Sequence, residues 1–104
     1  MDAVQQLVSE YKNRGIMYAH RLLLNKADAL EFADRLRAIG KGVLGLELWY
    51  YREPDREGLI EYIWSPDYSK LVNAPDFITE SIEAAENYIL NEMPEKIALI
   101  GFVF

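Results

Sequence analysis

The side chains best suited to recognition chemistry gather on one β-favouring stretch near the middle of the sequence, Gly42–Tyr51. Successive side chains of a strand point to opposite faces, so Glu47, Trp49 and Tyr51 share one face. A face that combines a carboxylate with two large aromatic rings is typical of one that is partly open to a partner. The alternative is a central strand buried on both sides, with packed aromatics and Glu47 hydrogen-bonded or at the rim.

The remaining reactive residue types form no catalytic or metal-binding pattern. The chain has no cysteine, which excludes thiol catalysis, disulfides and thiolate metal sites. His20 is the one histidine, and transition-metal sites need several such ligands, so we expect it on a strand surface or in a hydrogen bond. Gly42–Gly45 leads into a strand and is no phosphate loop. Two carboxylates could act as an acid–base pair, but spacing identifies none. We therefore predict no enzyme, no cofactor and no metal.

The charge is unevenly distributed along the chain. Residues 1–41 carry seven Lys or Arg against five Asp or Glu, whereas residues 42–104 carry four against twelve, and the net charge is −6. An acidic domain repels phosphate backbones, so we expect no binding to nucleic acid. The acidic part favours a basic protein partner. The alternative is that acidity only keeps a small protein in solution.

Length and composition predict a single domain, residues 1–104. The chain is 51% apolar and 27% charged, which is typical of an ordered globular protein. The first residues lack the basic and apolar regions of a signal peptide, and no apolar run approaches the roughly 20 residues of a membrane span. We expect a cytoplasmic protein that does not bind membranes.

The first third of the chain predicts a helix and a short strand. Apolar residues recur at spacings of three and four over residues 2–14, and Gly15 suits a helix end. Residues 16–22 read as a strand, with continuation of the first helix as the rival interpretation.

A second helix should begin after Asn25, a favourable N-cap residue, and end at Gly40. Glu31 and Arg35 are spaced for an exposed i,i+4 ion pair. Its expected buried face consists of Ala29, Leu30, Phe32, Ala33, Leu36 and Ile39.

Residues 43–51 and 59–64 should pair as a β-hairpin around a turn at Pro54-Asp55. A symmetric turn would set Trp49 opposite Ile60 and Glu47 opposite Tyr62. A slip of one residue would bring Glu61 to that face instead, and the sequence leaves the register open. The symmetric register gathers on one face Glu47, Trp49, Tyr62 and Trp64.

The last third predicts a long loop, a helix and a strand. Residues 65–75 are irregular, and a loop of that length in a small domain is often functional. A helix over residues 76–93 has an acidic outer face, and residues 96–104 read as a buried strand. The whole is an α+β fold: an N-terminal helix, then a β-α-β-β-α-β unit with a four-stranded, mainly antiparallel sheet, for which a ferredoxin-like order is possible.

Three stretches carry a resemblance to a known family: Ala27–Leu30 opening a helix, Ala38–Gly45, and Phe77–Ile89 before a terminal apolar strand. Together they resemble the immunity proteins of bacterial polymorphic-toxin systems, in particular immunity family 40. The resemblance covers residues 16–104. It implies a small cytoplasmic α+β protein that binds and blocks a cognate toxin domain, as in contact-dependent growth inhibition.

If the resemblance holds, the partner is a toxin domain. A basic nuclease is one such toxin, and its phosphate-binding cleft would be attracted to the acidic part of the chain. The protein would be a monomer or a weak homodimer. The outer face of the third helix is the second candidate surface. The partner-binding residues that we predict first are Glu47, Trp49, Tyr51, Glu61, Trp64, Asp67 and Tyr68.

Two other classes of function remain open. One is a homo-oligomeric structural or regulatory module that pairs through an exposed edge or the aromatic sheet face. The other is a small-molecule-binding domain or enzyme with the sheet face as the floor of a pocket.

Overall fold

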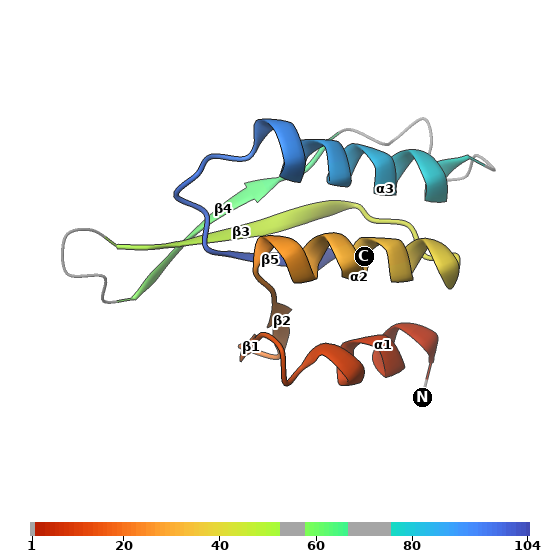
Figure 1. Cartoon of the computed structure of the whole chain (residues 1–104), viewed down its shortest axis with the longest axis horizontal. Coiled ribbons are helices and arrows are strands. Elements are labelled where there is room, and N and C mark those ends of the chain that lie inside the picture. Colours follow the sequence, from red (N-terminus) through yellow and green to blue (C-terminus); the bar gives the residue numbers. More distant parts are fainter. Residues whose placement is uncertain (1, 53–57, 67–75) are drawn as a thin grey trace.

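The computed structural model describes residues 2–52, 58–66 and 76–104, and it confirms the α+β class (Figure 1). No helix within these ranges is long and apolar enough to cross a membrane. The described elements are, in chain order, α1 (Ala3–Tyr11), β1 (Ile16–Tyr18), β2 (Arg21–Leu23), α2 (Lys26–Ala38), β3 (Gly45–Tyr51), β4 (Leu59–Trp64), α3 (Phe77–Asn87), the π-helical turn η1 (Tyr88–Glu92) and β5 (Leu99–Val103).

The strands form a three-stranded antiparallel sheet, with β3 between β4 and β5, and a separate β1–β2 hairpin. A single bridge between Leu24 and Ile100 links the end of the hairpin to β5. The expected four-stranded sheet with a possible ferredoxin-like order is therefore wrong. The segment predicted as one strand reverses at Ala19 and His20, which both adopt positive φ angles of 50° and 66°. Such turns usually contain Gly or Asn, and residues 16–22 contain neither, so local propensity did not predict this turn.

The β3–β4 pairing follows the slipped register. Trp49 lies opposite Glu61 and Glu47 opposite Ile63, so the symmetric register is wrong. Because the side-chain period of a strand is two, this shift of one residue moves Tyr62 and Trp64 to the other face of the sheet.

The helices cover one face of the three-stranded sheet, which we call the inner face. α2 and α3 run side by side there (Figure 1), and the core fills the space between them and the strands. Leu46 and Leu48 are fully buried in it, whereas Leu44 is exposed and precedes β3. Trp64 stacks on Tyr88 at the end of the α3 segment, with ring centroids 4.8 Å apart.

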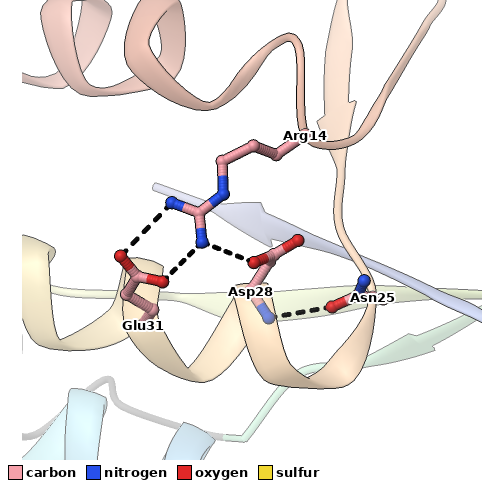
Figure 2. A network of polar contacts seen from close by, with 4 residues as sticks. All are labelled: Arg14, Asn25, Asp28 and Glu31. Atoms are coloured by element: carbon pink, nitrogen blue, oxygen red, sulfur yellow. Dashed lines mark hydrogen bonds and ion pairs between the residues drawn. The ribbon is translucent and has the colours of Figure 1, made fainter.

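α1 is joined to the start of α2 by a polar network (Figure 2). The Arg14 guanidinium donates to both carboxylate oxygens of Glu31, at 3.2 and 2.6 Å, and to Asp28 at 2.7 Å. Asn25 caps α2 as predicted, accepting from the Asp28 backbone N–H at 2.9 Å. The predicted Glu31–Arg35 pair does not form, because Arg35 instead contacts Glu10 of α1 at 2.7 Å.

This network sits immediately before the hairpin that bears on the functional site. Arg14 precedes Gly15, where a Cβ would lie 2.3 Å from the Leu23 carbonyl oxygen. Only glycine allows the chain to enter β1 so close to β2. The Arg14 contacts with α2 and the close approach at Gly15 thus both lie at the start of the β1–β2 hairpin.

Candidate functional site

The face of the sheet that points away from α2 and α3 carries the candidate site. Strand alternation and the observed register place on it the side chains of Glu47, Trp49, Tyr51, Glu61 and Ile63, and we call this set the outer face. Glu61 and Ile63 are exposed, Trp49 and Tyr51 are half-buried, and Glu47 is buried.

The β1–β2 hairpin lies over part of the outer face. The Tyr18 ring meets the edge of Trp49 at a centroid distance of 5.2 Å. Arg21 forms an ion pair with Oε1 of Glu47, from a side chain that is 56% exposed. Tyr18 and Arg21, which pair across the hairpin, therefore bring an aromatic ring and a cation to the predicted recognition strand.

Two polar atoms beneath this hairpin are buried without a hydrogen-bond partner in the part of the chain that the structure describes: Oε2 of Glu47 and Nε1 of Trp49. The Glu47 side chain is only 7% exposed. Burying a polar group unpaired costs about 1–3 kcal/mol, so such atoms are uncommon in folded proteins. One unpaired acceptor, on Glu47, and one unpaired donor, on Trp49, thus lie at neighbouring positions of the same strand face.

Two hollows flank Arg21. The first, which we call the hairpin pocket, has a volume of about 210 Å³ and includes Glu47, Arg21 and His20 in its lining. The second has a volume of about 250 Å³ and is lined by Tyr18, Ala19, Arg21, Trp49 and Glu61. The site therefore consists of two hollows on either side of Arg21, and the buried Glu47 carboxylate lines the first of them.

The predicted site residues are only partly brought together. The outer face brings together four of them: Glu47, Trp49, Tyr51 and Glu61. This is the set that the slipped register predicts. Trp64 does not lie on the outer face, since the register turns it inward onto Tyr88. Asp67 and Tyr68 lie outside the described residues.

Sequence reasoning missed the hairpin's contribution. Arg21 and Tyr18 reach the outer face only because the chain reverses at Ala19 and His20. His20, expected on a strand, is exposed at that turn and lines the hairpin pocket. The aromatic and charged residues of 16–22 were visible in the sequence, but nothing there placed them against Glu47.

The negative charge on the solvent-facing side of α3 is partly neutralised by a neighbouring helix. Glu86 forms an ion pair with Arg37 of α2, so it does not face solvent unpaired as the sequence suggested. Glu80 and Glu83 are exposed. Across the described ranges, no three His, Asp or Glu side chains are grouped so that they could hold a metal ion.

No protein-family model, curated protein or solved structure matches this chain. The resemblance to immunity proteins therefore rests on the residues quoted above and stays a prediction.

Proposed function

We propose that this protein is a cytoplasmic immunity protein that binds and neutralises a cognate toxin domain through its outer face. The observation that carries the proposal is the exposure of apolar and aromatic side chains around an acidic one. Ile63 is 55% exposed and Tyr18 is 47% exposed, and both lie close to Glu61 or to its cross-strand neighbour Trp49. Clustered exposed apolar side chains beside polar ones are typical of an interface.

Charge supports a basic partner. The chain carries −6, and twelve of its seventeen carboxylates follow residue 41. Complementary charge accelerates encounter with a basic domain and orients it, whereas the buried aromatic contacts hold the complex. A toxin with a phosphate-binding cleft has the basic surface that this arrangement requires.

The test is rescue of growth. The proposed toxin domain, sought among the neighbouring genes, is expressed with the wild-type protein, or with a triple variant Tyr18→Ser, Glu61→Lys and Ile63→Ser. We expect the wild type to restore growth and the triple variant to fail. The matched control is Glu80→Lys, the same charge reversal on the exposed surface of α3.

Binding should also be measured directly by capture of that toxin domain at low salt and at about 0.5 M salt, where charge interactions are screened within a few ångströms. A specific complex weakens but survives. Full rescue by the triple variant, or loss of rescue by the Glu80→Lys control alone, would refute the proposed surface.

One observation favours a second function, a homo-oligomeric module. Within the described ranges β4 pairs only with β3, so its other edge is open, and it carries Leu59, Ile60 and Ile63. Open apolar edges can pair with a second copy. Light scattering over a wide concentration range tests this alternative, which a constant monomer mass would eliminate.

A further inference from the structure

The hairpin pocket lies where β2 and β5 separate. The two segments are bridged at Leu24 and Ile100, but the structure shows no bridge between the following residues, Leu22 on β2 and Phe102 on β5. Both of these residues line the pocket, together with Gly101. The pocket therefore lies between the β1–β2 hairpin and the three-stranded sheet, and a side chain at position 101 would narrow it.

The Glu47 carboxylate supplies the polar group of this pocket. Its side chain is more than nine-tenths buried, and it lines the pocket from the neighbouring strand β3. Oε1 is paired with Arg21, whereas Oε2 has no hydrogen-bond partner among the residues described. An ionised carboxylate is an acceptor only, so a ligand that satisfies Oε2 must donate a hydrogen bond.

Apart from Arg21 and His20, the other walls are apolar or aromatic. Phe32, Phe102 and Phe104 line the pocket, and Val8 of α1 closes it further. Aromatic faces attract cations, and apolar walls favour an alkyl chain. Phe32 and Glu47 are buried, whereas His20, Arg21 and Phe104 are exposed, so the mouth and the interior are well distinguished.

The size of the pocket limits the ligand. Its volume of about 210 Å³ lies below the roughly 300–1,000 Å³ of sites that hold drug-sized molecules. It exceeds several-fold the roughly 30 Å³ share of one water molecule. A single group the size of an amino-acid side chain fits these limits.

We propose that the hairpin pocket binds a primary alkylammonium group. The ammonium donates a hydrogen bond to Oε2 of Glu47, and the alkyl chain lies against the phenylalanine rings. The group can belong to a free alkylamine or to a lysine side chain of a bound protein. The second source rests on the proposed function, whereas the pocket chemistry itself does not.

Substitution of Arg21 tests whether the ligand of the pocket is a cation or an anion. Its guanidinium lies on the same carboxylate, so it repels and competes with a second cation. Replacing it by Met removes the charge and keeps a similar length, and binding of an alkylammonium ion should become several-fold tighter. If the pocket instead takes an anion through Arg21 and His20, the same substitution weakens binding.

The experiment is an NMR titration of the wild-type chain with n-butylammonium chloride, with n-butanol and n-butyrate as matched neutral and anionic probes. We expect butylammonium alone to shift the amide signals of Gly101 and Phe102. Glu47→Gln should weaken it at least tenfold, as expected for loss of a hydrogen bond to a charged group. Glu80→Gln, an exposed carboxylate of α3 that does not line the pocket, is the control and should bind as the wild type does.

Phe104→Ala guards against a folding defect in the Glu47 variant, because Phe104 is an exposed residue at the pocket mouth. We expect it to weaken butylammonium several-fold while the fold is retained. Equal shifts from butanol or butyrate, or unchanged binding by both Glu47→Gln and Phe104→Ala, would overturn the proposal.

The two sources of the amine are separated with the captured toxin domain. If a toxin lysine occupies the pocket, Glu47→Gln weakens capture and butylammonium competes with the toxin. If capture is unaffected while butylammonium still binds, the ligand is a free amine, and the pocket assignment stands. Failure of growth rescue with intact butylammonium binding would refute the proposed function alone.

Discussion

The two faces of β3 differ in what covers them and in the polar groups that they carry. On the inner face Leu46 and Leu48 are fully buried beneath the helices. On the outer face, Glu47 and Trp49 alternate with them, and each retains a buried polar atom without a partner in the described structure. Hydrophobic burial stabilises the fold from one side, whereas the other side keeps unsatisfied groups and exposed apolar ones. We infer that stability and binding are divided between the two faces.

The largest expected effect is on the inner face. Leu48→Ala should lower the free energy of unfolding by about 2–5 kcal/mol, because it removes buried methyl groups and leaves a cavity. Ile63→Ala on the outer face is the matched control and should change it by less than about 0.5 kcal/mol. Urea denaturation measures both. Similar losses for the two variants would show that the faces are not divided as we infer.

The two tryptophans separate the faces further. Trp64→Ala should lower the free energy of unfolding by about 3 kcal/mol, because it removes the ring stacked on Tyr88. The same substitution should leave capture of the proposed toxin domain unchanged. Unfolding and capture are measured on the same preparation. Loss of capture with unchanged stability would return Trp64 to the binding site and argue against the inward orientation.

A smaller effect is expected where α1 is attached. The Arg14 guanidinium lowers the pKa of the Glu31 carboxyl through hydrogen bonds and charge. A carboxyl with a lowered folded-state pKa contributes stability above its ordinary pKa and loses it as the pH falls through the lowered value. Arg14→Ala should lower the melting temperature slightly at neutral pH, less so in high salt.

Acid denaturation checks this assignment. The difference in melting temperature between wild type and Arg14→Ala should shrink as the pH falls below the range in which Glu31 is ionised. A difference that stays constant from neutral to acidic pH would mean that Arg14 acts through packing and not through its carboxylate partners.

The smallest expected effect concerns Tyr88 on the inner face. Burial, with the neighbouring Tyr62, raises its pKa above the ordinary value of 10.0. The folded state therefore holds this proton more tightly, so the contribution is present below pH 10 and is lost as the pH rises through the raised pKa. Tyr88→Phe should flatten the alkaline decline in melting temperature. An identical alkaline decline in both proteins would contradict the assignment.

Sequence patterns predicted most of the helices and strands of this fold, but they did not predict the chain reversal at Ala19 and His20. The Asn25 cap and most of the periodicity of α2 are strong local signals that the structure confirms, although Ile39, predicted on the buried face, is exposed. The turn at Ala19 and His20 is held by contacts of the hairpin with β5 and the outer face, not by Gly or Asn. Local propensity therefore pointed to one strand.

The site was predictable up to one residue of register. Periodicity placed Glu47 and Trp49 together, but a shift of one position decided whether Glu61 or Tyr62 joined them. Trp64 was assigned to the wrong face for this reason alone. Arg21 and the hairpin pocket depend on contacts between segments distant in sequence, so no spacing rule could have revealed them.

The most direct test of this division is hydrogen–deuterium exchange on the protein with and without the captured toxin domain. We predict added protection in the β1–β2 hairpin and β4, and unchanged exchange along α3. Protection confined to α3, with the hairpin and β4 exchanging as in the free protein, would contradict the assignment of binding to the outer face.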